Sequence, residues 1–528
     1  MRAVAALLLV VAGAAPVHGQ GTRSWRVGER VIISDFSYIT ALGASRDLLY
    51  VVSPEGLGIY DRRFHRWEPP VTAVEGFPAQ PVSVALVDPV DRALLMGTMS
   101  GLLRYTRGMR LLEQIFVPGG VFNLMLDRDD TFSGTYLRTR YGWQFLPRGS
   151  LNPVPAGSLP PPHRQIRAGS VDEILDRMPH ILARSAELLT DRRMRRARFT
   201  AATIAPDNED VYLGTDGAGL LEVDMMTNAT RMPFGLLAPS VGALALGEGG
   251  VWVGTGYLPA RVGFTWVSDD IQTYAAEEGP PATGFRFRVV HDLVADGEQA
   301  LWAATDAGLW HVMVGGRGGR GRATRIAPEL ISEAEHVFAV APATTGLWAG
   351  TQRGLLFVDV DGDAYRVDDR VRFPILSLAA QGDTVWLGSE VGLGATWVGA
   401  EEIVITADQT NEPQLRAPIV DLAFTHDTLV AALQDRIAWR TPEGVWRIER
   451  VVTVELGDLT SLAADSGGMW IGGTRGFAFY RFDARSFAFF DARGDAPGPV
   501  RDVAAGEGYL WVGTDAGLAR FTKRAVLR

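Results

Sequence analysis

One phrase near the C-terminus recurs along almost the whole chain. It reads Leu510-Trp511-Val512-Gly513-Thr514-Asp515-Ala516-Gly517-Leu518. Recognisable copies begin at Leu94, Val211, Val251, Leu301, Leu347, Val385 and Met469. Self-similarity of this kind constrains the architecture more than any single residue, because each copy is one supersecondary unit that buries its faces only against neighbouring units.

Eleven units can be aligned on the position that Trp511 occupies in this phrase. Their spacing is about 40–50 residues, with one interval about twice as long, which is typical of four-stranded propeller blades. The residues at the aligned position are Tyr50, Leu95, Phe132, Tyr212, Trp252, Trp302, Trp348, Trp386, Val430, Trp470 and Trp511. The units at Phe132 and Val430 are degenerate. We expect the tryptophans to be structural and to pack on adjacent blades.

The pattern within a unit predicts strands only. Short apolar runs at 500–505, 509–514 and 518–522 are separated by turns rich in glycine and acidic residues. Glycines inside every unit exclude stacked helical repeats. The prediction is an all-β propeller with about eleven blades. Single rings have roughly four to eight blades, so we expect two rings.

Where the two rings divide is left open by the sequence. A split into five and six blades, or a ring built from both ends of the chain, is compatible with the repeats. An open ring would leave unpaired sheet edges, and closure removes them. We therefore expect Trp25-Arg26-Val27 to supply an outer strand to the blade that contains Trp511.

The order of a first strand, a Gly/Asp turn and Leu-Trp-Val-Gly-Thr-x-x-Gly-Leu resembles the two-component regulator propeller repeat. The resemblance covers about residues 35–528. It implies a β-propeller of the periplasmic sensor type, and similar propellers occur in proteins of the type IX secretion machinery. We expect no membrane span, kinase or response domain after Arg528, in contrast to the sensors of that family. We therefore expect any bound ligand to be signalled through a separate membrane protein.

The N-terminus predicts export. Arg2 precedes an apolar run from Ala3 to Ala15, and small or compact residues precede a cleavage site after Gly19. The run is shorter than the roughly 20 residues of a membrane span. We expect a cleaved signal peptide, a periplasmic or secreted location, and no transmembrane segment in the mature chain. An uncleaved anchor is the alternative.

The double-length interval holds the only segment that does not look like a propeller. Residues 151–162 are proline-rich, and Ser170 is a candidate N-cap for a helix that Pro179 breaks or restarts. A second helix is expected from Ile181 to Arg196, ending in a basic cluster at 192–198. A solvated helix end explains this cluster, and docking to an acidic partner is the alternative. The predicted domains are a signal peptide (1–19), three repeats (20–150), this insertion (151–199) and eight repeats (200–528).

Composition excludes several kinds of site. The chain of 528 residues has a formal net charge of −10 and no cysteine. The charge argues against nucleic acid as a partner, and the lack of cysteine removes disulfides and thiolate metal ligands. Asp359 to Asp363 is better interpreted as a hairpin than as a calcium loop, and the Gly/Arg tract 315–322 as a flexible loop. No metal and no cofactor are expected.

A ligand site is expected on one face of the propeller. In an antiparallel meander, the turn between the second and third strands lies on the face where the first strand begins. The turn residues are Asp306, Arg353, Glu390, Arg475 and Asp515, and the strand starts contribute His291, Asp292, His336, Asp421, Arg501 and Asp502. Mixed charges at the mouth of a channel suit polar ligands such as glycans or peptide ends.

Two hypotheses for function follow. The favoured one is a non-enzymatic binding or scaffold module of the cell envelope, whose partner is an envelope protein or a glycan. The alternative is a propeller lyase that acts on a glycan or lactone, with His291, His336, Asp421 and Arg501 converging on the channel. No Gly-x-Ser-x-Gly or His-Glu-x-x-His motif is present. Convergence of those four side chains in space distinguishes the hypotheses.

Overall fold

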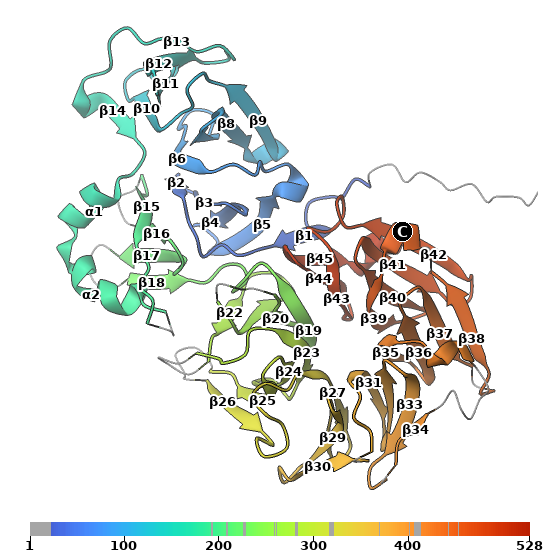
Figure 1. The fold of residues 1–528 in the computed structure, drawn as a ribbon. Coiled ribbons are helices and arrows are strands. Elements are labelled where there is room, and N and C mark those ends of the chain that lie inside the picture. The colour runs from blue at the N-terminus through green and yellow to red at the C-terminus, as the bar shows by residue number, and fades with distance from the viewer. Residues whose placement is uncertain are drawn as a thin grey trace, which may run out of the picture.

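The structure is a computed structural model. It describes residues 23–191, 194–206, 210–224, 229–257, 259, 261–279, 284–315, 321–368, 370–400, 402–405, 413–441, 443–451 and 453–528. Within these residues the strands form eleven antiparallel sheets (Figure 1). The predicted all-β propeller with about eleven blades is confirmed. The proposed signal peptide, Arg192 and Arg193 of the basic cluster, and residues 316–320 of the Gly/Arg tract lie outside the described residues.

Four sheets form an arc, here called arc blades one to four in chain order. Blade one contains β2 (Ala41–Ala44), β3 (Leu48–Ser53), β4 (Gly56–Asp61) and β5 (Arg66–Thr72). Blade two contains β6 (Val82–Val87), β7 (Leu94–Thr98), β8 (Gly101–Thr106) and β9 (Leu111–Phe116). Blade three contains β10 (Asn123–Asp127), β11 (Gly134–Thr139), β12 (Gly142–Pro147), β13 (Val154–Pro155) and β14 (Gln165–Arg167). Blade four contains β15 (Phe199–Ile204), β16 (Asp210–Thr215), β17 (Leu220–Asp224) and β18 (Ala229–Met232).

Seven sheets form a ring, here called ring blades one to seven. Blade one contains β19 (Val241–Gly247), β20 (Gly250–Thr255), β21 (Phe264–Ser268) and β22 (Tyr274–Glu277). Blade two contains β23 (Val290–Ala295), β24 (Ala300–Thr305), β25 (Gly308–Met313) and β26 (Arg322–Ile326). Blade three contains β27 (Val337–Ala343), β28 (Gly346–Thr351), β29 (Gly354–Asp359) and β30 (Ala364–Val367). Blade four contains β31 (Ile375–Gln381), β32 (Thr384–Ser389), β33 (Gly392–Trp397) and β34 (Val404–Ile405). Blade five contains β35 (Ile419–Thr425), β36 (Thr428–Leu433), β37 (Arg436–Arg440) and β38 (Trp446–Arg450). Blade six contains β39 (Leu459–Asp465), β40 (Gly468–Gly473), β41 (Gly476–Arg481) and β42 (Ser486–Asp491). Blade seven joins β43 (Val500–Ala505), β44 (Tyr509–Thr514) and β45 (Gly517–Thr522) to β1 (Arg30–Ile33).

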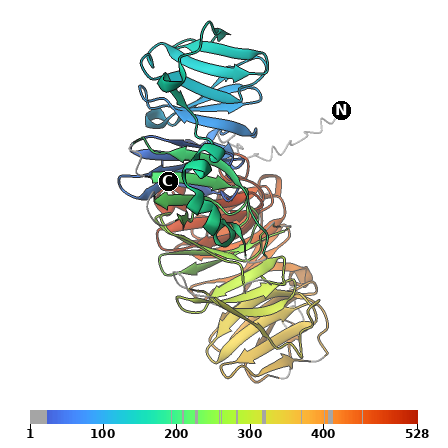
Figure 2. The same ribbon diagram turned by 90° about the vertical axis from the view of Figure 1, so that its left-hand side faces the viewer.

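The ring closes and the arc stays open. The inner strands β19, β23, β27, β31, β35, β39 and β43 contact one another in that order, and β43 contacts β19 again. In the arc, β15 contacts β2, β2 contacts β6 and β6 contacts β10 (Figure 1). Figure 2 shows the arc and the ring placed end to end. The eleven blades therefore divide into a closed seven and an open four, and the ring uses both ends of the chain.

The strand that joins the termini is β1. It pairs with β45, with Arg30 opposite Phe521 and Ile33 opposite Leu518. The prediction that Trp25-Arg26-Val27 forms this strand is wrong, because the chain turns at Gly28, whose φ is 85°. Trp25 instead donates its indole N–H to Asp495 at 2.8 Å and packs on Phe521.

Two helices in the insertion cover one end of the arc. They are α1 (Val171–Arg177) and α2 (Pro179–Leu189), and Pro179 restarts the helix at its first position. The predicted extension to Arg196 is wrong, because Thr190 is extended and Asp191 closes a turn with Arg195. Shorter helical segments are η1 (Ala73–Glu75), η2 (Arg107–Met109), η3 (Pro162–Arg164), η4 (Pro413–Arg416), α4 (Thr453–Leu456) and α5 (Lys523–Val526). None of the described helices is both long and apolar enough to span a bilayer.

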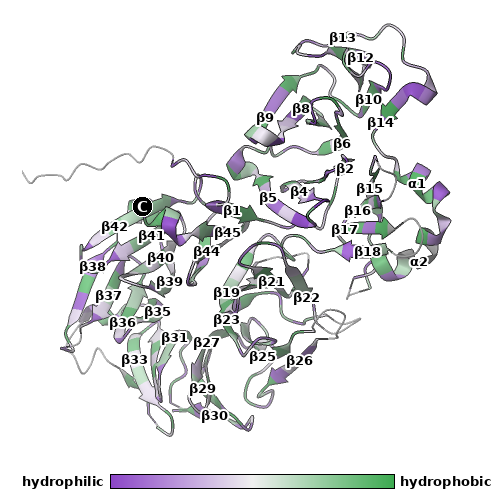
Figure 3. Ribbon diagram, turned by 180° about the vertical axis from the view of Figure 1, so that it is seen from behind, coloured by the Kyte–Doolittle hydropathy of each residue, from purple (hydrophilic) through white to green (hydrophobic). Residues whose placement is uncertain are grey.

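Arc and ring share one hydrophobic core at their junction. A single cluster of buried residues contains Val51 and Tyr212 of the arc together with Val253 and Trp511 of the ring. Trp67 stacks on Phe234 with ring centroids 3.8 Å apart. Figure 3 shows mainly apolar residues along the inner strands and polar residues on outer strands such as β38. The junction therefore resembles the interior of a domain more than a flexible linker.

The aromatic position of the repeat is mostly buried, as expected. Trp348, Trp470 and Trp511 have no exposed surface, whereas Trp302 remains partly exposed. The assignment of Phe132 to this position is wrong. Phe132 lies in a turn and is 73% exposed, and the second strand of that blade begins two residues later, at Gly134.

Removing β1 should destabilise the ring. A chain that begins at residue 34 loses the burial of Val31, Ile32 and Ile33, each worth about 1.5–3 kcal/mol. We expect a clearly lower midpoint in thermal unfolding than for a chain that begins at residue 23. Equal midpoints for the two chains would show that the terminal strand does not clasp the ring.

Trp511→Ala should cost about 3–5 kcal/mol of unfolding free energy, because it empties a fully buried site. Trp302→Ala, at the same position of a different blade, should cost less, since Trp302 already touches solvent. Urea unfolding of both variants measures the difference. A larger loss for Trp302→Ala would contradict the assignment.

Candidate functional site

The predicted turns and strand starts do share one face of the ring. Strand pairing places Val290 at the start of β23 opposite Thr305 at the end of β24, and Val500 opposite Thr514 in the same way. The connections between blades also reach this face, because each outer strand runs back toward it. We call it the turn face.

A β-bulge opens every inner strand of the ring on the turn face. In each blade the register shifts at the second residue of the strand, so that this residue has no partner. The seven bulged residues are Gly242, His291, Phe338, Leu376, Val420, Thr460 and Arg501. Bulges re-aim side chains at rims and sites. The mouth of the ring therefore presents a different bulged residue in each blade, with a side chain in every case except Gly242.

Three of the predicted site residues tie adjacent blades together. The carboxylate of Asp292 accepts the N–H of Leu293 and, at 2.8 Å, the N–H of Val340 in the next blade. Asp421 and Asp502 repeat this arrangement. Asp421 reaches the Leu462 N–H at 2.6 Å and Asp502 the Leu244 N–H at 2.7 Å. These aspartates satisfy backbone donors between inner strands, so their main contacts are structural.

Burial raises the pKa of each of these aspartates. The pKa of Asp292 rises to about 6 and that of Asp421 to about 7, and Asp502 is also raised well above its usual range. Repulsion from Asp421 and Asp292 adds to the shift of Asp502. The three residues come from blades two, five and seven, which are not neighbours. Each of them is the third residue of an inner strand, so the three lie at the same level around the ring axis.

The two histidines at the mouth meet each other. Nε2 of His291 lies 3.2 Å from Nδ1 of His336, and the rings are stacked. Burial, with the charge of His336 as a second cause, lowers the pKa of His291 to about 4. His291 is therefore neutral near pH 7. Arg501 instead forms a bidentate pair with Asp515 at 2.7 Å, and Asp421 is held by backbone N–H groups.

The remaining predicted residues are turn tips. Asp306 accepts the N–H groups of Arg288 and Val289 and so shapes its own turn. Arg353, Glu390 and Arg475 are exposed. Of the four residues proposed to converge, only the two histidines touch. Within the described residues, no group of three or more His, Cys, Asp and Glu side chains is placed to hold a metal ion.

A cavity of about 480 Å³ lies where arc, ring and insertion meet. The arc contributes Trp67 and the turn 217–220, the linker to the ring contributes residues 233–237, and the ring contributes Tyr274. The end of α2 and the residues after it complete the wall with Glu187, Thr190, Asp191 and Met194. The volume falls within the range typical of small-molecule sites, which often occur at domain interfaces.

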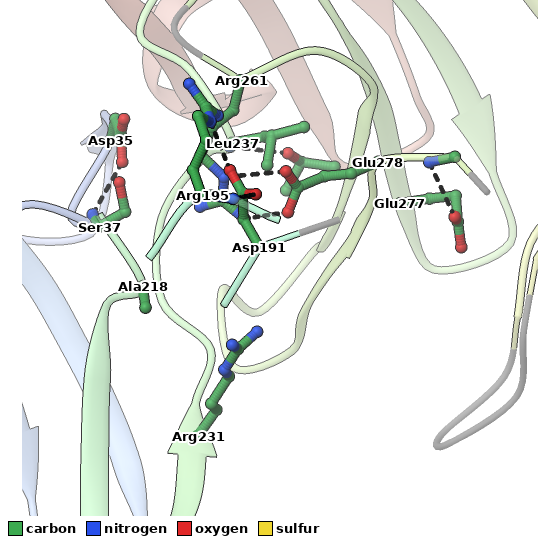
Figure 4. Close-up of polar contacts among 12 residues, drawn as sticks. Asp35, Ser37, Asp191, Arg195, Ala218, Arg231, Leu237, Arg261, Glu277 and Glu278 are labelled. Carbon is green, nitrogen blue, oxygen red and sulfur yellow. Dashed lines mark hydrogen bonds and ion pairs between the residues drawn. The ribbon is translucent and has the colours of Figure 1, made fainter. Parts of the chain in front are cut away.

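One wall of this junction cavity is charged. Arg261 forms a two-bonded ion pair with Glu278, and both side chains are mostly buried. Burial alone would lower the pKa of Arg261, but Glu278, Asp35 and Asp191 outweigh it and raise the pKa. Figure 4 shows Asp191 and Arg195 of the insertion beside this pair. The charged groups therefore come from both sides of the junction.

Another part of the lining is aromatic. Phe234 lies between Trp67 and Phe36, with centroid distances of 3.8 Å and 4.7 Å, and its edge meets Tyr274. The Leu237 N–H is held by Thr265 Oγ1 at 2.9 Å, which fixes the linker that carries Phe234. A cavity with one apolar and one charged wall can take a ligand that has both a ring face and polar groups.

Sequence reasoning missed Arg261, Glu278 and the cavity. All of its charged residues lie outside the repeated phrase. The sequence does contain one indication of this site, which is a long turn. The turn after Thr255 runs to Gly263, whereas the equivalent turn after Thr514 ends at Gly517. A long turn within a regular frame is a candidate functional insertion.

Comparison with known proteins supports the fold. PorZ, a surface component of the type-IX secretion system of Porphyromonas gingivalis, is similar over 94% of this chain and 87% of its own, with 12% identity and a TM-score of 0.55. The extracellular domain of the putative hybrid two-component system BT4673 of B. thetaiotaomicron matches 92% of this chain and 69% of its own, with 13% identity and a TM-score of 0.42. Virginiamycin B lyase of Staphylococcus aureus matches 54% of this chain and 95% of its own, with 11% identity and a TM-score of 0.43.

No family model and no curated protein matches the sequence. The chain is a multi-blade β-propeller, and its likeness to PorZ supports that fold.

Asp421→Ser should flatten the dependence of stability on pH. The folded pKa of Asp421 is above that of the unfolded chain, so its contribution is complete below about pH 4 and is lost as pH rises through about 7. One pKa unit corresponds to about 1.4 kcal/mol. Serine already occupies the equivalent position in two blades, at Ser377 and Ser461. Thermal unfolding from pH 4 to pH 8 measures the slope.

Asp383→Ser is the matched control, because Asp383 is an exposed residue of the same ring. It should leave the pH profile unchanged. If Asp421→Ser keeps the full slope of the parent protein, the buried carboxylate is not its source.

Proposed function

We propose that this chain is an exported, non-enzymatic β-propeller of the cell envelope that binds a polar ligand in the junction cavity. A glycan or a peptide end fits the lining best, because each combines apolar surface with hydrogen-bonding groups. Export rests on the N-terminal pattern of Arg2 and the apolar run that follows it. The ligand-binding part of the proposal rests on the cavity.

The position of the cavity favours a sensor-like role. Its walls come from the arc, the ring and the insertion, so a bound ligand would contact all three. Binding would stabilise the arrangement of these parts that fits the ligand. A separate envelope protein that contacts the arc and the ring could then read the bound state.

The contacts at the channel mouth favour binding over catalysis. A lyase needs a charged group that stabilises negative charge on its substrate. Arg501 is already paired with Asp515, and Asp421 is bonded to the backbone of two blades. His291, which is neutral near pH 7 and contacts His336, is available as a proton acceptor, so a lyase acting on a glycan or lactone is the alternative to test.

Ala218→Trp should block the cavity. Ala218 lines it, and its N–H is bonded to Thr215 Oγ1 in a turn between two strands. We expect at least about a tenfold loss of affinity for glycans or peptides that the parent protein selects from an array of envelope polysaccharide and peptide fragments. Isothermal titration calorimetry measures the loss.

Ala516→Trp is the matched control, since Ala516 occupies the same place in the turn of ring blade seven, bonded to Thr514 Oγ1. It should bind as the parent does. Selected ligands that bind Ala218→Trp at full strength would place the site elsewhere. Turnover of a selected glycan or lactone that is lost in His291→Ala or His336→Ala would move the protein into the lyase class.

A further inference from the structure

The two ends of the open arc differ in how well their outer sheet faces are covered. At arc blade four, α1 and α2 pack on the outer face of the sheet, where Ile174 and Ile181 join Val211 and Leu221 in one buried cluster. The helices thus take the place that a further blade would occupy. Arc blade three, at the other end, carries its own partly uncovered surface.

The free face of blade three is aromatic. Strand pairing puts Tyr136 opposite Phe145 and Arg138 opposite Trp143, so these four side chains share one side of β11 and β12. The other side carries Leu137, which is fully buried against blade two. Tyr136, Trp143 and Phe145 all keep partial exposure, and Arg138 lies over the Trp143 ring at 5.8 Å.

Beside this face, the loops of blades two and three expose four large apolar side chains. Met99 is 62% exposed, Phe116 72%, Phe122 41% and Tyr141 73%. They are contiguous, because the Gly119-Gly120 pair runs between the Met99 and Tyr141 loops. A Cβ on Gly119 would lie 2.8 Å from the Tyr141 ring, and one on Gly120 2.8 Å from the Met99 carbonyl oxygen.

The charge around these side chains is positive only. Arg138 and Arg140 are exposed, and neither has a carboxylate partner among the described residues. The three loop segments 98–101, 116–123 and 138–142 contain no aspartate or glutamate. The whole chain has a net charge of −10, so this basic surface contrasts with the rest. We call Met99, Phe116, Phe122, Tyr141, Arg138 and Arg140 the arc-end patch.

We propose that the arc-end patch docks a partner protein through an acidic segment that also carries apolar side chains. Phe, Tyr, Met and Arg are the residues enriched at the centres of protein interfaces, where Lys is depleted, and the patch consists of these four types alone. The two arginines select an acidic partner and speed its approach. The patch is separate from the junction cavity, so the proposal does not depend on what the cavity binds.

The probe is a set of three synthetic peptides with the same apolar residues, whose charged positions are all Glu, all Gln or all Lys. Fluorescence anisotropy should show that the Glu peptide binds the parent protein best and weakens as salt is added. Arg138→Glu with Arg140→Glu should lower its affinity at least about tenfold and make the Lys peptide the better ligand. Phe116→Ser with Tyr141→Ser should weaken all three, since the apolar anchors are gone.

Two controls make the result specific to this surface. Arg353→Glu with Arg475→Glu reverses two exposed arginines on the ring and should leave peptide binding unchanged. Ala218→Trp, which blocks the cavity, should also leave it unchanged. The arginine, Phe116 and Tyr141 variants change exposed side chains and should unfold at the parent's temperature.

Several outcomes would overturn the proposal. These are no preference for the Glu peptide, or equal binding by the parent and the Arg138→Glu, Arg140→Glu variant. A dimer in sedimentation velocity that the same variant dissociates would assign the patch to a second copy of this chain. Cosedimentation with phosphatidylglycerol vesicles, lost in Phe116→Ser with Tyr141→Ser, would assign it to a membrane surface.

Discussion

The structure depends on the need of each sheet to cover two apolar faces. A blade whose inner strands read as nearly continuous apolar residues is stable only between two neighbours. The ring meets this requirement by closing on itself, since β43 packs against β19 and β1 completes the outer edge of the last blade. The four blades of the arc do not close in this way, since the described inner strands β10 and β15 at its two ends do not pack against each other as neighbouring inner strands do. The arc instead uses the ring at one side, α1 and α2 at one end, and leaves blade three partly uncovered at the other.

Closure of the ring also leaves backbone N–H groups near the axis that need hydrogen-bond acceptors. The inner strands present backbone N–H groups close to one another, and Asp292, Asp421 and Asp502 each satisfy one in the next blade. Burial raises the pKa of each of these carboxylates, and repulsion from the others adds to the shifts of Asp421 and Asp502. Residues that the sequence suggests as ligand-binding groups therefore hold neighbouring blades together by hydrogen bonds.

The features that suggest function lie in parts of the chain that depart from the repeated blade pattern. The junction cavity is built from a lengthened turn, a linker and the end of the helical insertion. The arc-end patch lies beside the face of blade three on which a fifth arc blade would otherwise pack. A repeated frame supplies rigidity, while departures from it supply distinct surfaces. The two proposed sites occupy different parts of the molecule, which suits a module that binds a ligand at one place and a protein at another.

Local pattern determined the strands, the turns and the number of blades. The strands predicted at 500–505 and 509–514 match β43 and β44, because glycine turns and short apolar runs are properties of a few neighbouring residues. The choice of β1 over Trp25-Arg26-Val27 followed from a turn at Gly28 and from burial against β45, which adjacent sequence does not encode.

The division into seven and four blades, the contact of His291 with His336 but not with Arg501, and the cavity around Arg261 and Glu278 were decided only by tertiary structure. Each of them joins residues far apart in the chain, and a single sequence records what each residue is but not which distant residue it meets.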